Sequence, residues 1–237
     1  MKSVVKKIEN SLQIIDCGLA DYRQVLNQQH QLHEERRQDK IPDTVLIVEH
    51  PSVITLGARQ SANKLLAAKE ELLQRDIDVV QVRRGGGTTA HNPGQLVFYP
   101  ILKLRELGLS INEYIRKLET IGTELLEQLG VRSERLKGLP GLWIMDGKRA
   151  TSDERRDTKK IASIGVRVSK GVTYHGMAIN INNDLSIFDL FVPCGLDGVE
   201  MTSVLKETSK KKSMDDVKKK LTVLLINHFS GSINHES

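Results

Sequence analysis

Residues 160–182 read KIASIGVRVSKGVTYHGMAININ, and this stretch predicts a β-hairpin. Two apolar runs rich in β-branched residues flank residues 169–171, Ser-Lys-Gly, a short polar sequence typical of a tight turn. The two runs span residues 161–168 and 172–181. Gly165 interrupts the first run, and a glycine inside a strand often marks the close approach of a ligand or a second backbone. The hairpin therefore predicts a sheet with an accessible stretch of backbone at Ser163, Ile164 and Gly165.

A second informative stretch is residues 84–95, RGGGTTAHNPGQ, which follows a predicted strand. Three consecutive glycines allow the backbone to approach a ligand, and their amides can hold an anion or a carbonyl oxygen. The stretch is neither a P-loop nor a GxGxxG motif, so it gives nucleotide binding little support. A plain tight turn is the alternative interpretation. Arg84, Thr89, His91 and Gln95 favour a binding loop, because they supply more polar groups than a turn needs.

The third stretch is FVPCGLDG, residues 191–198, in which Cys194 stands between a proline and a glycine after an apolar run. A buried structural cysteine is the commoner role, and a nucleophile is the alternative. A thiol with a reference pKa of about 8.5 reacts as the thiolate, and a nearby lysine could favour that form. Cys17 lies between Asp16 and Gly18 without a comparable setting, and we interpret it as structural.

The remaining periodicity predicts an α/β protein with a single domain over residues 1–237. Helices are expected at 21–37, 64–75, 110–130 and 213–229, and further strands at 44–50, 52–57, 77–82, 96–102 and 141–145. Ser110 and Glu113 have the spacing of a capping box at the start of the third helix. Residues 146–160 are highly charged and are expected to form a turn or hairpin tip. A smaller helical subdomain from about Gly198 is the alternative to one domain.

Composition narrows the function classes. The longest apolar runs are too short to span a membrane, and the first residues lack the apolar core of a secretory signal. We therefore expect a cytoplasmic protein with no membrane partner. A net charge of +5 favours acidic partners, either nucleic acid or an acidic carrier protein. The basic clusters are scattered and not interleaved with aromatic residues, so nucleic-acid binding is disfavoured.

Taken together, these stretches resemble the lipoyl(octanoyl) transferases, lipoate-biosynthesis enzymes of the biotin/lipoate protein ligase fold. The matching motifs are RGGxxTxHxPGQ at 84–95, KIASIGVRV at 160–168, YHGMAININ at 174–182 and PCG at 193–195. They occur in order within a resemblance that covers about residues 22–205. The resemblance implies a mixed central sheet flanked by helices. It also implies transfer of an octanoyl group to a lysine of a lipoyl domain through an acyl-cysteine thioester, the first step of endogenous lipoate biosynthesis.

The resemblance assigns the acyl thioester to Cys194 and places Lys160 beside it as the residue that tunes the thiol. It assigns acyl binding to Arg84, Gly85, Gly86, Gly87, Thr88, Thr89, Ala90, His91, Ser163, Ile164, Gly165, Gly176, Met177 and Ala178. His175 is either a supporting catalytic group or a buried, hydrogen-bonded histidine. Amides beside Cys194 and in the 85–87 loop are candidates for holding an oxyanion. Asn92 departs from the glycine that is usual in the family, and residues 146–159 are longer and more charged.

The expected donor is octanoyl-acyl carrier protein, and the expected acceptors are lipoyl domains of 2-oxoacid dehydrogenases and the glycine-cleavage carrier protein. No metal or cofactor is expected, because a thioester is already activated. The alternatives are an ATP-dependent lipoate-protein ligase or a lipoyl amidotransferase of the same fold, a catalytically silent carrier-binding module, and a cysteine hydrolase. Dependence on ATP, acyl mass on Cys194, and hydrolysis without an acceptor distinguish them.

Overall fold

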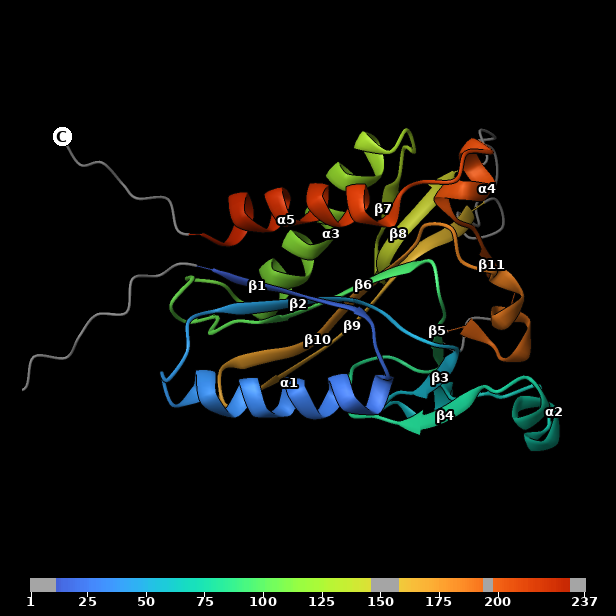
Figure 1. The fold of residues 1–237 in the computed structure, drawn as a ribbon, viewed down its shortest axis with the longest axis horizontal. Helices are drawn as coiled ribbons and strands as arrows, with labels where there is room; N and C mark the ends of the chain where they lie inside the picture. The colour runs from blue at the N-terminus through green and yellow to red at the C-terminus, as the bar shows by residue number, and fades with distance from the viewer. Residues whose placement is uncertain (1–11, 146–157, 194–197, 231–237) are drawn as a thin grey trace, which may run out of the picture.

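The computed structural model describes residues 12–145, 158–193 and 198–230. A mixed sheet forms its centre (Figure 1). In order across this sheet lie β1 (Gln13–Leu19), β2 (Thr44–Glu49), β6 (Gln95–Ile101), β10 (Val172–Asn180), β9 (Thr158–Ser169), β8 (Leu139–Met145) and β7 (Glu134–Leu136), with β11 (Glu200–Met201) paired to β9. β1 is parallel to β2 and β11 to β9, whereas the other neighbours are antiparallel.

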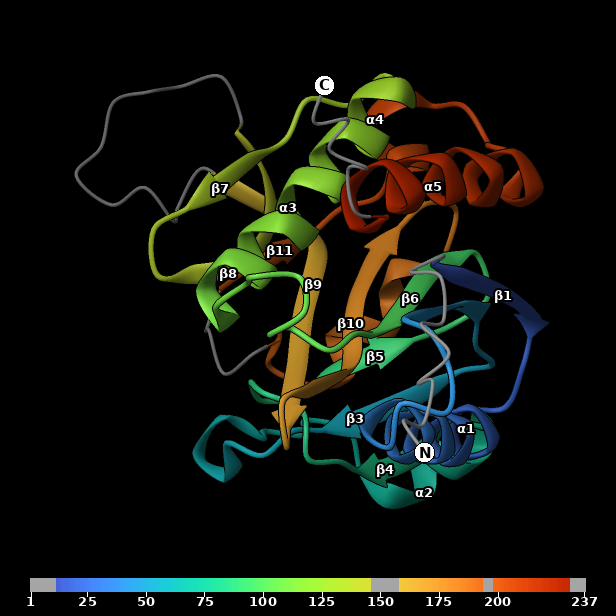
Figure 2. The ribbon, with the colours of Figure 1, turned by 90° about the vertical axis from the view of Figure 1, so that its left-hand side faces the viewer.

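Helices cover both faces of the sheet (Figures 1 and 2). α1 (Tyr22–Arg37) covers one face, and α3 (Ile111–Gln128) and α5 (Met214–Phe229) lie together on the other, with the short α4 (Val204–Thr208) preceding α5. Successive side chains of a strand point to opposite faces, so a central strand must be apolar on both. Along β6, Phe98 packs in the cluster with α3, whereas Val97 and Tyr99 pack in the cluster with α1. The predicted mixed sheet flanked by helices is confirmed.

A smaller sheet stands beside the end of the large one. It contains β4 (Asp78–Gln81), β3 (Val53–Leu56) and β5 (Thr89–His91), in that order, and is accompanied by η1 (Gln60–Ala62), α2 (Lys69–Gln74) and η2 (Leu185–Leu190). The predicted strands 44–50 and 52–57 both form, but they belong to different sheets. The chain therefore changes sheets at His50 and Pro51, and this change brings the glycine-rich loop against β9.

Most long elements form as predicted, and the departures have local causes. The helix expected at 64–75 is shortened to α2, because Leu65 forms a β-bridge with Phe191 and the amides of Leu66 and Ala67 donate to the carbonyl oxygen of Leu190. Thr158 to Lys160 belong to β9 rather than to a charged turn. The rest of that segment, residues 146–157, lies outside the described residues. β1, β5, β7, β11 and α4 were not predicted, since each is short or only half apolar.

The hairpin of β9 and β10 closes as its sequence predicts. Lys170 and Gly171 have φ values of +50° and +81°, the pattern of a type I′ turn. Gly165 and Gly176 then face each other across the two strands. A Cβ on Gly165 would lie 2.8 Å from Cδ of Arg84, and a Cβ on Gly176 would overlap the carbonyl oxygen of Phe98. These glycines therefore provide room for the neighbouring loop and strand.

The C-terminal helix shares the main core. Val217, Leu221 and Leu225 of α5 are buried in the same apolar cluster as Leu118 of α3 and Phe98 of β6. α3 begins with the predicted capping box, in which the Ser110 side chain accepts from the Glu113 amide and Glu113 accepts from the Ser110 amide. Among the described residues, no helix is both long and apolar enough to cross a membrane.

Glycine also permits the contact between β3 and the glycine-rich loop. A Cβ on Gly57 would overlap the carbonyl oxygen of Gly86, and a Cβ on Gly87 would overlap the carbonyl of Ala62. Two backbone hydrogen bonds fix this contact, from the Ala58 amide to the Arg84 carbonyl (3.0 Å) and from the Arg59 amide to the Gly86 carbonyl (3.2 Å). The loop can therefore lie against β3 only while these positions lack a side chain.

We expect Gly57→Ala to lower the free energy of unfolding by about 3 kcal/mol or more, because a methyl group would overlap fixed backbone atoms. Gly138→Ala is the matched control, since Gly138 has a φ of +78° but open space around its Cα. Its expected loss is about 1 kcal/mol, from backbone strain alone. Urea denaturation measures both losses, and equal values would refute the packing argument.

Candidate active site

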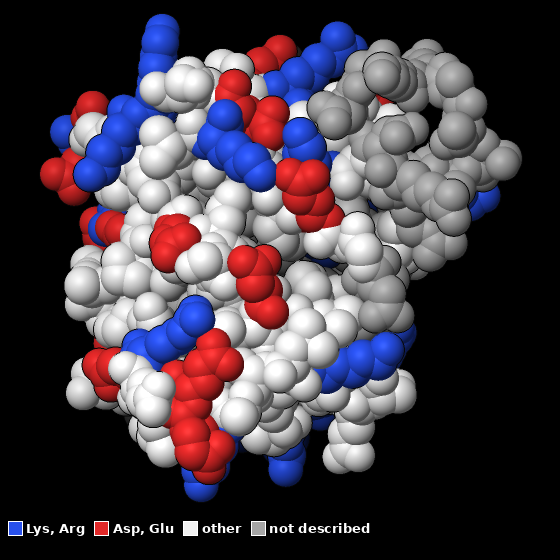
Figure 3. Space-filling view, turned by 90° about the vertical axis from the view of Figure 1, so that its right-hand side faces the viewer, with Lys and Arg blue, Asp and Glu red and all other residues white. Residues whose placement is uncertain are grey.

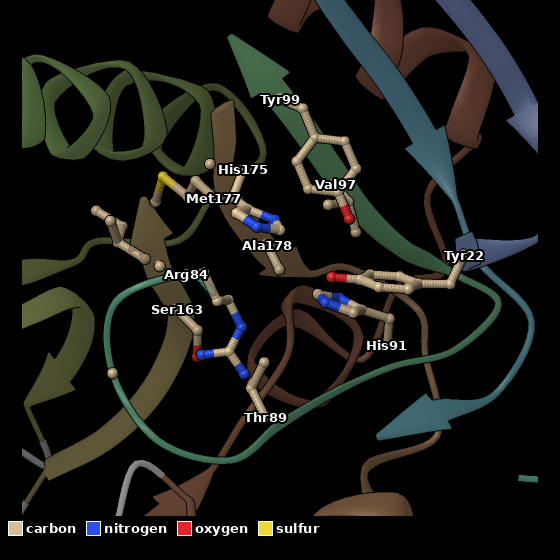
Figure 4. Close-up of a pocket in the computed structure, with 14 residues that line it drawn as sticks. Tyr22, Arg84, Thr89, His91, Val97, Tyr99, Ser163, His175, Met177 and Ala178 are labelled. Carbon is tan, nitrogen blue, oxygen red and sulfur yellow. The ribbon is translucent and has the colours of Figure 1, made fainter. Parts of the chain in front are cut away.

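A narrow pocket lies where β9, β10 and β6 meet α1 and the small sheet (Figure 4). It is lined by Tyr22, Arg84, Gly86, Thr89, His91, Val97, Tyr99, Ser163, Ile164, Gly165, His175, Gly176, Met177 and Ala178. The free cavity measures about 30 Å³, which is room for about two water molecules. An acyl chain could enter only if flexible side chains such as Met177 moved aside.

The structure brings most of the predicted binding residues to this pocket and leaves some outside it. Arg84, Gly86, Thr89, His91, Ser163, Ile164, Gly165, His175, Gly176, Met177 and Ala178 line it, whereas Gly85, Gly87, Thr88 and Ala90 do not. Ala90 is buried in the apolar cluster beneath the small sheet, and the Thr88 hydroxyl donates to Oδ1 of Asn63. In this loop, alternate residues support the fold and face the pocket, because the loop leads into a strand.

Arg84 fastens the glycine-rich loop to β3. Its guanidinium donates to the Thr55 hydroxyl at 2.7 Å and 3.2 Å and to the Thr55 carbonyl at 2.9 Å. The side chain is only 6% exposed. A buried cation at the wall lowers the pKa of nearby histidines and so favours their neutral forms.

Three buried histidines and two tyrosines form the polar part of the site. Nδ1 of His50 faces the carbonyl oxygen of Ala20 at 2.7 Å and must carry the proton, so Nε2 accepts from the Tyr99 hydroxyl at 2.9 Å. The Gln95 amide nitrogen donates to Asn180, and its oxygen accepts from Nδ1 of His91 at 2.7 Å. Burial lowers the pKa of His50 to about 4 and that of His91 well below its usual value. These rings are therefore neutral at physiological pH.

His175 has an unusual backbone and an unsatisfied ring nitrogen. Its φ is +57°, a region that few residues other than glycine adopt, and its amide donates to the Gln29 side chain at 2.9 Å. Nδ1 is buried without a hydrogen-bond partner. Burial, followed by the charge of Arg84, lowers the pKa of the ring to about 3. The structure thus presents a neutral imidazole in the wall of the pocket.

Lys160 lies on β9, three residues before Ser163, and is 3% exposed. Its Nζ donates to the carbonyl oxygen of Pro140 at 3.2 Å and sits 4.8 Å from the ring centroid of Trp143. The next amide along, that of Gly141, donates to the buried carboxylate of Glu119 at 3.2 Å. The Pro140 carbonyl and the Trp143 ring thus both contact the side-chain nitrogen of Lys160. The strand β8 and helix α3 therefore hold Lys160 in one place.

Known proteins resemble the chain over most of its length. Residues 21–225 match the lipoyl protein ligase A/B catalytic domain. The chain belongs to this family. An octanoyltransferase of Syntrophobacter fumaroxidans is 42% identical over 204 residues, which cover 86% of this chain and 84% of that protein. An octanoyltransferase of Roseiflexus sp. is 42% identical over 212 residues, which cover 89% and 84%. The resemblance predicted from the four motifs is confirmed.

A solved structure shares the fold at low sequence identity. It contains a bi-partite lipoate protein ligase and its E2 lipoyl domain from Thermoplasma acidophilum, and it superposes with a TM-score of 0.65 at 15% identity. The match covers 93% of this chain and 84% of that one. The predicted biotin/lipoate protein ligase-like architecture is confirmed by this similarity, which at such an identity concerns the fold alone.

The predicted nucleophile, Cys194, lies outside the described residues. The described residues on its two sides, Pro193 and Gly198, both line one surface depression together with Met201. Met201 pairs with Lys160 in the β11–β9 ladder, and the Thr202 amide donates to the Lys160 carbonyl at 2.9 Å. The described chain after Gly198 therefore joins the large sheet beside Lys160.

Two further expectations concern the loops. The Gly85 amide donates to the carbonyl of Val166 at 3.0 Å, so in this conformation it cannot also hold an oxyanion. The Asn92 side chain does not line the pocket. Its amide donates to the Asp184 carbonyl at 2.7 Å, and its oxygen accepts from Asn183 at 3.1 Å. Asn92 thus ties the turn before β6 to residues 183–184, which a glycine could not do.

Sequence reasoning missed Tyr22, Val97 and Tyr99 as pocket residues. Val97 and Tyr99 belong to a strand that is buried on both faces, and Tyr22 falls on the apolar face of α1. Nothing in the periodicity separates a core position from a pocket position. Cys17 is half-buried, and burial raises the pKa of its thiol, as suits a structural cysteine. No group of three potential metal ligands occurs in the parts of the chain that the structure describes.

The buried neutral histidines predict that the free energy of unfolding decreases as the pH falls. When unfolded, His50 would bind a proton below about pH 6.5, whereas the folded protein resists protonation down to about pH 4. The unfolded state therefore binds more protons in this window, and stability decreases as the pH falls through it. Replacing His50 by Gln should reduce this slope by up to about 1 kcal/mol per pH unit.

Urea denaturation of the wild-type protein and His50→Gln between pH 6.5 and 5 measures the difference. Comparing the two proteins at each pH cancels the contribution of carboxylates, which both share. Parallel curves would show that His50 is not kept neutral by the fold.

Proposed function

We propose that this protein is an octanoyltransferase that carries the octanoyl group on Cys194 and delivers it to a lysine of a lipoyl domain. The observation that carries the proposal is the 42% identity to octanoyltransferases over 86% and 89% of the chain. The buried Lys160 on β9, and a narrow pocket lined by Ser163, Ile164 and Gly165 of the same strand, support it. The enzyme is then an acyltransferase of lipoate biosynthesis.

In the first half-reaction, the Cys194 thiolate attacks the carbonyl carbon of the donor thioester. A new carbon–sulfur bond forms and the bond to the donor's sulfur breaks. The donor's sulfur takes a proton from the Lys160 ammonium, so the donor leaves as a thiol and Lys160 is left neutral. The Lys160 ammonium, held by Pro140 and Trp143, favours the thiolate electrostatically. This half-reaction needs no oxidant, reductant or nucleotide, because the thioester supplies the activated acyl group.

In the second half-reaction, the amine of the acceptor lysine attacks octanoyl-Cys194. A carbon–nitrogen bond forms, the Cys194 thiolate leaves, and the amine loses a proton. We assign the removal of that proton to Lys160, which must be neutral at this step. The products are an octanoyl amide and the free enzyme. The low solvent exposure of Lys160 and of the pocket protects the acyl-enzyme from water while it waits for a protein acceptor.

We place the acyl group in the pocket. Lys160 and Ser163 lie on the same strand, β9, so the pocket lies along the strand that carries the residue we place beside the reacting carbonyl. The carbonyl would lie near Lys160, and the tail would extend toward Ile164, Met177 and Ala178. Each buried methylene contributes about 0.8 kcal/mol, so the tail supplies much of the binding energy.

We assign the donor to acyl carrier protein and the acceptors to lipoyl domains and the glycine-cleavage carrier protein, in the cytoplasm. The octanoyltransferases that the chain resembles imply an acyl donor and a lipoyl-domain acceptor. On the face shown in Figure 3, basic and acidic side chains are interspersed. The described residues of that face form no continuous basic stripe, so a small acidic protein fits better than a nucleic acid.

An ATP-dependent lipoate ligase of the same fold is the second candidate, because the lipoate protein ligase of Thermoplasma acidophilum shares the architecture. The transferase is favoured, since the octanoyltransferases are 42% identical and the ligase only 15%. The two reactions differ in one requirement: a ligase must form an acyl-adenylate from a free acid.

Intact-protein mass spectrometry tests the transferase directly. After mixing with octanoyl-acyl carrier protein and no ATP, the wild-type chain should gain one octanoyl group, and Cys194→Ala should gain none. Lys160→Ala should form the adduct at least about a hundredfold more slowly. Cys17→Ala is the matched control and should behave as the wild type.

The adduct should discharge onto an apo lipoyl domain. An adduct that hydrolyses without an acceptor would indicate a hydrolase, and a chain that never gains acyl mass would indicate a binding module. Labelling that occurs only with ATP and free octanoate would move the protein to the ligase class.

The environment of Lys160 gives a second prediction. Trp143→Leu should lower kcat about tenfold with little change in KM, since a cation–π contact of about 1–2 kcal/mol is lost. Trp143→Phe also loses volume but keeps an aromatic face, and it should retain most of the activity. Steady-state kinetics with saturating acceptor measure both variants. Equal losses in the two would mean that the tryptophan acts through packing alone.

A further inference from the structure

Two hollows of the molecule share a single wall residue. The first is the narrow pocket of about 30 Å³ described above, and the second is a groove of about 690 Å³ between the start of α1, the small sheet and α2. Tyr22 lines both. Since Tyr22 is the first residue of α1 and only 3% exposed, its side chain is enclosed between them.

Tyr22 stands at the far end of the pocket from the reacting groups. Ser163 belongs to β9, the strand that carries Lys160, and the sheet continues through β10 to β6 before it reaches the α1 side. Figure 4 shows Ser163 and Tyr22 on opposite sides of the pocket, with the Tyr22 hydroxyl pointing into it. An acyl tail that enters from the Lys160 side therefore ends against the Tyr22 ring.

The wall at this end is one residue thick. The Tyr22 ring stacks on His91 with centroids 5.6 Å apart and planes at 14°, and it meets the edge of His50 at 5.1 Å. On its other side it packs in an apolar cluster with Val53, which lines the groove. Val53 and His91 face each other in the β3–β5 ladder. Pocket and groove are thus separated by the Tyr22 side chain and the two residues that hold it.

We infer that Tyr22 sets the upper limit of acyl chain length, and that the groove behind it can take the distal methylenes of a longer chain when the ring is removed. This inference rests on the proposed octanoyl transfer, because it names the specificity of the same site. A rigid ring in a fixed stack blocks a chain at a sharp length, whereas an unbranched side chain could swing aside.

The groove offers an alkyl chain apolar surface from Val53, Leu72, Ile77 and Val79. Its charged lining residues are Asp21, Lys69, Asp76 and Asp78. Each methylene that leaves water for such a surface favours binding by about 0.8 kcal/mol, or roughly fourfold in affinity. A chain that passes the position of Tyr22 should therefore gain affinity with each added carbon, rather than lose it to a closed wall.

The test compares acyl donors with 8, 12 and 14 carbons on acyl carrier protein. The wild-type enzyme should use the eight-carbon donor and discriminate against the others. In Tyr22→Ala, the ratio of kcat/KM for the 14-carbon donor to that for the eight-carbon donor should rise at least about a hundredfold. Mass spectrometry of the apo lipoyl domain identifies the transferred chain. Tyr22→Leu keeps the apolar contact with Val53 and should shift the ratio in the same direction if the alanine variant does not fold.

Two controls separate a gate from a general loosening. Leu26→Ala removes a side chain that packs against the cluster containing Tyr22 but lines neither the pocket nor the groove, so its ratio should stay within about threefold of the wild type. Adding Ala67→Trp to Tyr22→Ala places a bulky ring in the groove and should abolish the gain for long chains.

The outcomes are distinct. An unchanged ratio in folded Tyr22→Ala or Tyr22→Leu, an equal rise in Leu26→Ala, or a gain that survives Ala67→Trp would each overturn the gate. If the wild-type enzyme transfers the octanoyl group, such a result refutes only the gate. If the wild-type enzyme transfers no acyl group of any length, the proposed function itself fails.

Discussion

The close approach of the glycine-rich loop to β3 and β9 is the constraint on which the site depends. Gly57 and Gly87 let two backbones meet where any Cβ would overlap a carbonyl, and Gly165 leaves room for Arg84 beside the sheet. Arg84 then bonds to Thr55 and fixes the loop. Because the contacts at Gly57 and Gly87 are made by backbone atoms, they leave space beside the loop available as a pocket.

The sequence predicted the parts of this arrangement that follow from local chemistry. The turn at Lys170 and Gly171, the cap at Ser110 and the continuous apolar run of β6 each have a local physical cause, and each forms. The change of sheet after His50 could not be predicted, since the strands on both sides of it are equally apolar. The helix expected at 64–75 is shortened because a distant strand partner, Phe191, competes for Leu65.

In the candidate site, too, some residues could be predicted from the sequence and others could not. Motifs pointed to Arg84, His91 and the backbone of Ser163 to Gly165, which do meet in one pocket. Tyr22 was assigned to a helix face, because helical periodicity records that a residue is buried and not which space it borders. The β11–β9 ladder pairs Met201 with Lys160. Such a ladder of two residues leaves no signal in the sequence, and the placement of Cys194 beside Lys160 stays a prediction of the family resemblance.

The buried histidines place polar groups in a site that must also hold an apolar chain. Unpaired polar groups in an apolar site cost stability, yet His50 is paired with Ala20 and Tyr99, and His91 is paired with Gln95, each through a fixed tautomer. Burial keeps the rings neutral, so the wall offers an alkyl chain no extra charge besides Arg84. A neutral, tightly bonded wall also leaves little space for water. An acyl thioester that must survive until a protein acceptor arrives is best protected in such a site, and this links the stability of the core to the order of the two half-reactions.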